Sequence, residues 1–188
     1  MSGLWVFVCG PSGAGKDSVL GWAAHALGRR PDIVFARRLV TRASHPGSDH
    51  DEVSQEQFAR LVDCNALAWR WQAHGFHYGV ESRFAAMVAA GRVVVVNGSR
   101  EHVNTLPVAE QLRVVQIEVD AVQLAARLAL RSRDTPQEVA RRLARNALFP
   151  DLHADCTIVN QRELAHAGHQ LVDYLVASRA AEPSWRSL

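Results

Sequence analysis

Five short apolar runs recur along the chain, each bounded by glycine or polar residues. Runs of this length predict strands, and runs without a polar face predict strands that are covered on both sides. The clearest is residues 93–96, four consecutive valines, which we expect at the centre of a sheet. The predicted strands are residues 4–9, 33–40, 92–97, 112–119 and 156–159.

Segments with apolar residues at helical spacing lie between and after these runs. Ser54 and Gln57 have the spacing of a capping box, and Pro136 follows Thr135 at the first position of another helix. Alternating strands and helices predict an α/β fold, with a mostly parallel five-stranded sheet between helical layers. The predicted helices are residues 16–28, 54–63, 81–90, 100–106, 120–132, 136–148 and 161–179.

Two stretches do not fit a plain open sheet. Residues 41–52 are polar and turn-rich, and residues 66–80 mix aromatic with polar side chains. Both lie between the second predicted strand and the third predicted helix, and 188 residues fit one domain. We therefore expect a single domain, with a core of residues 1–40 and 91–188 and an inserted subdomain of about residues 41–90.

Composition argues against several classes of function. The net charge is only +2 and there is no long basic run, so we expect no nucleic-acid partner. No apolar run approaches the length of a membrane span, and Gly10 and Lys16 interrupt any signal-peptide core. The three cysteines are widely spaced and odd in number, which indicates the reducing cytoplasm. The sequence does not decide whether the chain forms a homodimer.

The strongest chemical signal follows the first predicted strand. Residues 10–16 have the spacing G-x-x-x-x-G-K of a phosphate-binding loop, and Lys16 is the only lysine among 21 basic residues. Glycines let backbone N–H groups surround phosphate oxygens, and the following helix adds its positive end. We therefore expect the loop to bind ATP. The predicted binding residues are Gly10, Pro11, Ser12, Gly13, Ala14, Gly15, Lys16, Asp17 and Ser18.

The loop departs from the common pattern directly after Lys16. The usual next residue is serine or threonine, whose hydroxyl binds Mg²⁺, but here Asp17 comes first and Ser18 second. A carboxylate is also a hard oxygen ligand, so Asp17 is a candidate Mg²⁺ ligand, directly or through water, with Ser18 nearby. The alternative is that Asp17 is a favourable acid in the first turn of a helix.

Arginines gather near the end of the second predicted strand, at Arg37, Arg38 and Arg42. Guanidinium groups hold phosphate oxygens in pairs, and ligand sites in open α/β folds collect at the carboxyl ends of strands. This cluster therefore indicates a site for a phosphorylated acceptor. The alternative is a solvated basic edge.

A second group of arginines surrounds a short loop at residues 131–135, between two predicted helices, and the predicted lid covers about residues 131–141. In a phosphotransferase, such a loop closes as a lid that excludes water and places guanidiniums on the transferring phosphoryl group. Arg131 and Arg141 are the preferred candidates. The alternative is a helix surface made basic by a general preference for arginine.

With these segments in order, the chain resembles the guanylate kinase family over essentially its whole length. The matching segments are residues 10–16, 41–42, 74–79 and 158–160, together with the arginine-bearing lid. The resemblance implies that the inserted subdomain binds the acceptor, and that Arg42 and Tyr78 hold its phosphate. Trp69 stands where the family has its guanine-reading acid, and an indole offers only a donor. GMP is therefore not the expected acceptor.

Where the chain differs from guanylate kinases, it resembles a narrower group, the ribose 1,5-bisphosphate phosphokinases of phosphonate catabolism. The shared segments are residues 15–18, 37–38, 41–42, 71–75, 78–79 and 95–100. The resemblance implies transfer of the γ-phosphoryl group of ATP to the 1-phosphate of ribose 1,5-bisphosphate, which gives 5-phosphoribosyl 1-diphosphate and ADP. A base-free bisphosphate suits a chain with many arginines and no guanine-reading acid.

The accepting group in this reaction is an ionised phosphate oxygen, so no general base is needed. We expect Lys16 and the two lid arginines to be catalytic, with Mg²⁺ bound to ATP, and Arg38 to join Arg42 and Tyr78 at the acceptor. Arg100 is a candidate for the acceptor's second phosphate, with an exposed arginine at a helix start as the alternative.

Two other functions stay open. One is a guanylate-kinase-like binding module that has lost catalysis and recognises a phosphopeptide, although the complete phosphate loop argues against it. The other is a nucleotide kinase with altered base choice, which a panel of acceptors including GMP would reveal.

Overall fold

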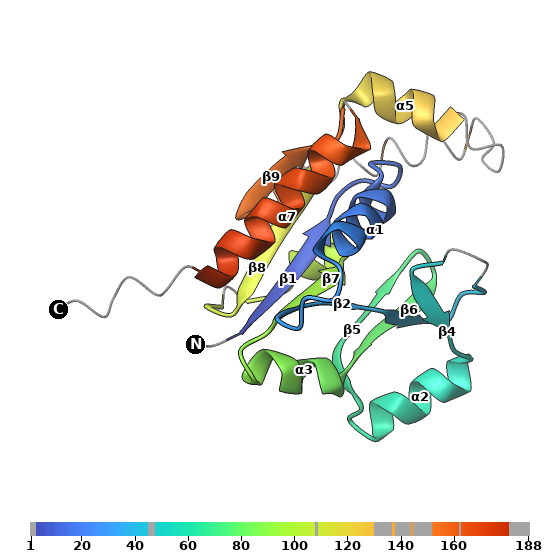
Figure 1. The fold of residues 1–188 in the computed structure, drawn as a ribbon. Helices are drawn as coiled ribbons and strands as arrows, with labels where there is room; N and C mark the ends of the chain where they lie inside the picture. The colour runs from blue at the N-terminus through green and yellow to red at the C-terminus, as the bar shows by residue number, and fades with distance from the viewer. Residues whose placement is uncertain are drawn as a thin grey trace.

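A computed structural model of the chain describes residues 3–44, 48–107, 109–129, 137, 144, 152–161 and 163–180. Its central element is a parallel five-stranded sheet with the strand order β2-β7-β1-β8-β9 (Figure 1). The predicted sheet of five mostly parallel strands is thereby confirmed. The strands are β1 (Leu4–Cys9), β2 (Ile33–Ala36), β7 (Val93–Asn97), β8 (Leu112–Glu118) and β9 (Cys156–Val159).

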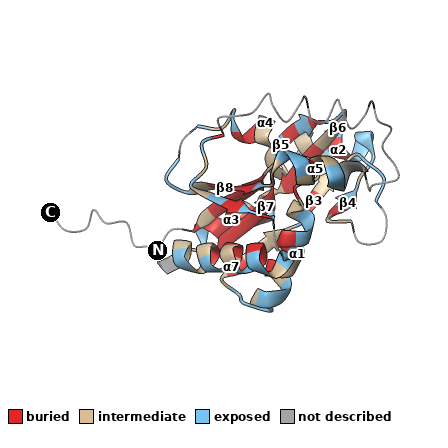
Figure 2. Cartoon of the chain, turned by 90° about the horizontal axis from the view of Figure 1, so that it is seen from above, coloured by how far each residue is buried: buried red, intermediate tan, exposed pale blue. Residues whose placement is uncertain are grey.

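The central strands β1 and β7 are buried on both faces, which explains why they are apolar throughout apart from Asn97 (Figure 2). Along β1, Val6 and Val8 face one cluster, to which α1 (Lys16–Leu27) and α7 (Leu164–Ala180) contribute. The alternate residue Phe7 faces the other cluster, which α3 (Ser82–Ala89), α4 (Arg100–Val103) and a second sheet complete. The four valines of β7 divide between the two clusters in the same way.

The second sheet is a mixed four-stranded sheet with the order β4-β3-β6-β5, and helix α2 (Gln55–Asp63) lies on its outer side (Figure 1). The capping box predicted for α2 is present: Ser54 Oγ accepts from the Gln57 N–H, and Gln57 Oε1 accepts from the Ser54 N–H. The strands are β3 (Arg38–Val40), β4 (His50–Glu52), β5 (Leu67–Ala73) and β6 (Phe76–Glu81).

The strand predicted at residues 33–40 is wrong as a single element. The chain leaves the first sheet after Ala36 and enters the second at Arg38, because Arg37 turns outward to bind Asp51. The strands within residues 41–80 were not predicted, since β4 is wholly polar and the Trp–Arg–Trp–Gln alternation of β5 was interpreted as a mixed segment. Helix α4 is shorter than the predicted 100–106. The helix predicted at 136–148 lies outside the described residues, apart from residues 137 and 144.

Helix α5 (Ala121–Ala129) lies beside the first residues of α7 (Figure 1). The predicted lid at 131–141 follows α5 in the sequence and lies outside the described residues apart from residue 137. None of the helices in the described ranges has both the length and the apolar composition that a membrane crossing requires. The β-sheets and helices therefore bring two regions together: the carboxyl end of β1 and the inner face of the second sheet.

Candidate active site

The phosphate loop joins β1 to α1, and residues outside it fix its shape. Gly13 and Gly15 have positive φ angles of 98° and 84°, which glycine adopts without strain. A Cβ on Gly15 would lie 2.6 Å from Asn160 Nδ2, so the chain after β9 closes directly against the loop. Asn160 Nδ2 donates to the Ala14 carbonyl at 2.8 Å, and Arg127 of α5 donates to the Asn160 carbonyl at 2.8 Å.

Lys16 folds back over this loop. Its Nζ donates to the carbonyls of Gly10 at 3.0 Å and Pro11 at 3.2 Å. Burial lowers the pKa of the Lys16 ammonium from its usual value, against the opposing effect of the neighbouring Asp17 carboxylate. The first turn of α1 also presents N–H groups that have no partner within the helix. An anion that enters the loop would meet these N–H groups and the ammonium together.

A cavity of about 520 Å³ opens between the loop, the end of β7 and the second sheet. It contains most of the predicted ATP-side and acceptor-side residues, although they are far apart in the sequence. The predicted site residues that line it are Gly10, Ser12, Lys16, Asp17, Arg38, Arg42, Tyr78 and Arg100. Four of these are cations, and three carboxylates, Asp17, Asp49 and Glu101, also line the cavity.

The other predicted site residues lie elsewhere. Pro11 and Ala14 are buried and shape the loop, and Ser18 is exposed on α1 and does not line the cavity. Arg131 and Arg141 fall outside the described residues.

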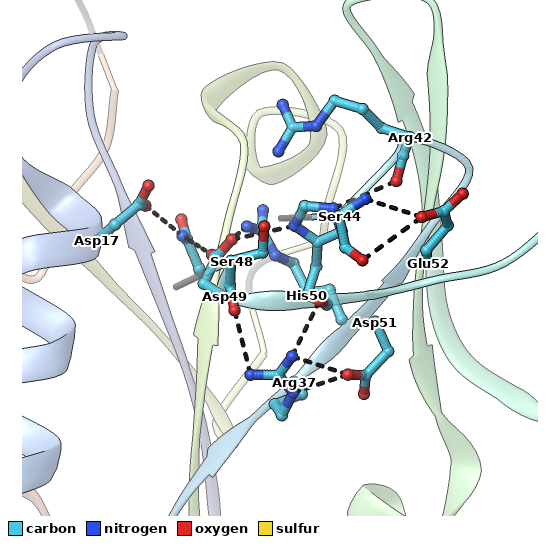
Figure 3. A network of polar contacts seen from close by, with 11 residues as sticks. Asp17, Arg37, Arg42, Ser44, Ser48, Asp49, His50, Asp51 and Glu52 are labelled. Carbon is cyan, nitrogen blue, oxygen red and sulfur yellow. Dashed lines mark hydrogen bonds and ion pairs between the residues drawn. The ribbon is translucent and has the colours of Figure 1, made fainter. Parts of the chain in front are cut away.

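A polar network crosses the cavity from one side to the other (Figure 3). Arg38 donates to Asp49 Oδ2, and Asn97 donates from Nδ2 to Asp49 Oδ2 at 2.5 Å and to Asp17 Oδ1 at 2.8 Å. Burial alone would raise the pKa of Asp49, but Arg38, Asn97 and His50 together hold it below its usual range. The network therefore keeps Asp49 ionised and ties the acceptor side to the phosphate loop.

The three neighbouring arginines separate in the structure. Arg37 binds the exposed Asp51 and the His50 carbonyl, and it does not line the cavity. Arg38 is 8% exposed and pairs with Asp49 inside the cavity. Arg42 is exposed and lies over the Phe76 ring, 5.9 Å from its centroid. Protein carboxylates therefore neutralise two of the three charges.

Aromatic rings form one wall of the cavity. Trp71 stacks between Tyr78, at 5.3 Å and 7°, and the buried His102, at 4.7 Å and 9°. Burial lowers the pKa of His102 to about 4, so this imidazole is neutral at pH 7 and acts as a packing ring. Trp69 packs edge-on against Phe7 in the core and does not line the cavity. The position that reads guanine in the resembled family is therefore part of the core here.

Sequence reasoning did not identify Asp49 and Asn97 as site residues. The Asn97 amide joins the carboxylates of Asp17 and Asp49. The sequence does contain a signal for Asp49: two aspartates, at positions 49 and 51, follow a pair of adjacent arginines within a polar stretch. Matching these opposite charges suggests two arginine–aspartate pairs. The sequence alone does not show that the pair of Arg38 and Asp49 faces the cavity.

The parallel sheet, the phosphate loop after its central strand and the adjoining cavity define a P-loop kinase with a guanylate-kinase-like fold. The crystal structure of guanylate kinase from Anaplasma phagocytophilum agrees: it has a TM-score of 0.67 and covers 96% of this chain and 88% of its own at 18% identity. At that identity, the similarity shows the fold alone. No protein-family model matches the chain.

Curated relatives identify the family within this class. The ribose 1,5-bisphosphate phosphokinase PhnN of Acidiphilium cryptum is 42% identical over 178 residues, which are 95% of each chain. The protein of the same name from Burkholderia pseudomallei is 44% identical over 90% of this chain and 94% of its own. The one from Agrobacterium fabrum is 38% identical over 92% and 96%. The chain therefore belongs to the ribose 1,5-bisphosphate phosphokinase family.

Proposed function

We propose that the chain transfers the γ-phosphoryl group of ATP to the 1-phosphate of ribose 1,5-bisphosphate, and that it acts in phosphonate catabolism. The observation that carries this proposal is the single cavity that contains both the phosphate loop and the arginines of the second sheet. Family membership supports the acceptor. The products are 5-phosphoribosyl 1-diphosphate and ADP.

In the proposed reaction, an oxygen of the 1-phosphate attacks the γ-phosphorus of ATP, and the bond to the β–γ bridging oxygen breaks. The loop N–H groups and Lys16 hold the donor phosphates. Arg42, Tyr78 and Arg38 orient the accepting phosphate, and Arg100 binds the second phosphate at C5. The attacking oxygen is already ionised, so catalysis consists of positioning and charge neutralisation. Arg131 and Arg141 of the lid would complete this neutralisation.

The cavity also suits Mg²⁺. Asp17 and Asp49 bind the same Asn97 amide, which places two carboxylates near the loop. Within the described ranges, no group of three or more histidine, cysteine, aspartate or glutamate side chains gathers to form a metal cage. Mg²⁺ in kinases uses one or two carboxylates with water and substrate phosphates, so this donor set fits it. When bound, Mg²⁺ supplies charge neutralisation at the phosphates, and Asp17 is its proposed protein ligand.

The Asp17→Asn substitution tests that assignment. Asparagine keeps the acceptor for the Asn97 amide but removes the charge, so we expect the Mg²⁺ concentration for half-maximal turnover to rise about tenfold. The affinity for ATP in the absence of Mg²⁺, measured by calorimetry, should be unchanged. An unaltered Mg²⁺ requirement would leave Asp17 as only an acid in the first turn of α1, and a raised requirement in Ser18→Ala instead would assign the ligand to Ser18.

One coupled assay tests the function. ADP release is measured with ribose 1,5-bisphosphate, GMP and AMP as separate acceptors, and we expect turnover with the first and only background rates with the nucleotides. Turnover with a nucleotide alone would identify a nucleotide kinase with altered base choice. A chain that binds ATP and transfers to none of the three would support the binding-module alternative.

The cysteines bear on where the reaction takes place. All three are free: Cys9 is buried in β1, Cys64 is exposed and Cys156 is partly buried. Free thiols fit a reducing compartment, and we propose that the enzyme acts in the cytoplasm.

A further inference from the structure

Asp49 is a carboxylate inside a cavity that is built to bind phosphates. Its side chain is 27% exposed and lines the cavity together with Lys16, Arg38, Arg42 and Arg100. A carboxylate in this place repels the phosphates of donor and acceptor, and its pairing with Arg38 offsets part of the positive charge that Arg38 offers to the accepting phosphate. Contact with phosphate therefore gives no reason for an acid here, and Asp17, which directly follows Lys16, is the carboxylate assigned to Mg²⁺.

The hydrogen bonds of Asp49 leave one oxygen largely available. Oδ2 accepts from both Arg38 and Asn97, whereas Oδ1 has, in the part of the chain that the structure describes, only the His50 Nδ1 contact at 3.4 Å. An ionised carboxylate offers about four lone-pair sites and no donor. Where Asp49 meets a ligand in the cavity, Oδ1 can therefore accept only from a group that carries a proton, such as a hydroxyl.

The position of Asp49 limits which hydroxyl it can reach. The Asn97 amide bridges Asp49 to Asp17, and Asp17 directly follows Lys16 in the phosphate loop. Asp49 therefore lies close to the loop, near the phosphoryl group in transfer, rather than at the distant end of the acceptor pocket. A hydroxyl that meets it must lie near the accepting phosphate of the substrate.

We propose that Asp49 accepts a hydrogen bond from the hydroxyl on the carbon next to the one that carries the accepting phosphate. The inference rests on the proposed function, in which that hydroxyl is the 2-OH of ribose 1,5-bisphosphate. In a nucleoside monophosphate, the phosphate is on C5′, and the neighbouring carbon carries the ring oxygen and no hydroxyl. Asp49 would thus select a sugar 1-phosphate against nucleotides.

The first arm of the test uses the unaltered enzyme. Values of kcat/KM are measured with ribose 1,5-bisphosphate and with 2-deoxyribose 1,5-bisphosphate, which lacks only the proposed partner of Asp49. We expect kcat/KM for the deoxy compound to be at least about tenfold lower, because loss of the 2-OH leaves the charged Asp49 carboxylate without its hydrogen-bond donor. No mutation is involved, so this arm does not depend on the stability of a variant.

The second arm measures the ratio of kcat/KM for the ribose compound to kcat/KM for the deoxy compound, and compares this ratio in Asp49→Ala and Asp51→Asn. Asp51 is a matched control, since it also pairs with an arginine but lies on the surface outside the cavity. Asp49→Ala should lower the ratio to about two or less, through loss of activity on the ribose compound, while Asp51→Asn keeps the ratio. If Asp49 were purely structural or only bound metal, Asp49→Ala would lower kcat/KM equally for both acceptors and leave the ratio intact.

The outcomes separate the inference from the function beneath it. Equal kcat/KM values for the two acceptors with the unaltered enzyme would overturn the inference and leave the proposed reaction standing. Absence of turnover with ribose 1,5-bisphosphate would overturn the proposed function itself, and the inference with it. A ratio that survives Asp49→Ala in a folded variant would also refute the inference, and circular dichroism establishes the folding.

Discussion

The Lys16→Ala enzyme will lose about a thousandfold in kcat with its fold intact. Lys16 is the only lysine in the chain, and its ammonium already lies against the carbonyls of Gly10 and Pro11. Removing one preorganised charge from a phosphoryl-transfer site costs about 10²- to 10³-fold, or more when the charge meets the transferring group. The measurement is ADP release under saturating ATP and acceptor, with thermal denaturation as the check on folding.

Lys16→Arg should be nearly as inactive, because a planar guanidinium does not replace a compact ammonium within this loop. Arg83→Ala provides the control, since Arg83 is exposed, pairs with Glu81 and does not line the cavity. Near-normal turnover in Lys16→Ala would contradict the loop's assigned role. A loss of turnover that merely follows unfolding would contradict the expectation that the fold stays intact.

The uniqueness of Lys16 gives this prediction a chemical readout. Only the unprotonated amine reacts with acylating reagents, and burial lowers the pKa of Lys16, so its labelling should begin at lower pH than that of a free lysine. Bound ATP brings negative charge to the ammonium, which raises its pKa, and also covers it. Labelling should therefore decrease when ATP is added, as peptide mass spectrometry can measure.

The contrast between Lys16 and Asp49 shows how far the sequence can predict this site. The loop is local: seven consecutive residues specify the turn, the cation and the helix that follows, so its spacing predicted the structure directly. The Asp49 network depends on Asn97, which is 48 positions from Asp49 and 80 positions from Asp17 in the sequence. No pattern in the chain encodes these contacts. It depends on how the second sheet lies against the end of β7.

The adjacent arginines make the same point at shorter range. Arg37 and Arg38 are identical in type, and the sequence placed both at a phosphate site. Successive side chains at the end of a strand point in opposite directions, so only one can enter the cavity. Which one enters is decided by the break after Ala36, where the chain changes sheets. The sequence predicted one continuous strand there, so it could not separate the two roles.

Replacing Arg38 with methionine should raise the KM for the acceptor by at least about tenfold and lower stability, because the change affects both the ligand and Asp49. A buried or partly buried charge that loses its partner costs about 2 kcal/mol or more. At the size of this domain, that loss lowers Tm by about 4–8 °C. Methionine fills much of the same volume, so the effect reports the charge more than a void.

The stability effect should depend on pH in a defined direction. Arg38, Asn97 and His50 hold the pKa of Asp49 below its usual value of 3.8 against the effect of burial, so the stabilisation is fully present above about pH 4 and is lost as pH falls through the folded pKa. In Arg38→Met, burial is no longer opposed by the guanidinium, and Asp49 takes up a proton at higher pH. The difference in Tm between the two proteins should therefore be largest near pH 7, begin to shrink where Asp49 of Arg38→Met takes up its proton, and shrink further as pH falls through the folded pKa of the unaltered protein.

Arg37→Met is the matched control for this last experiment. Its salt bridge to Asp51 is about half exposed on both sides, and such pairs contribute at most about 1 kcal/mol. We expect little change in Tm and none in the KM for the acceptor. Equal effects of the two substitutions on KM would mean that the arginine inside the cavity has no special role at the acceptor. A difference in Tm for Arg38→Met that is constant from pH 7 to pH 3 would show that Asp49 is not the group that the guanidinium holds ionised.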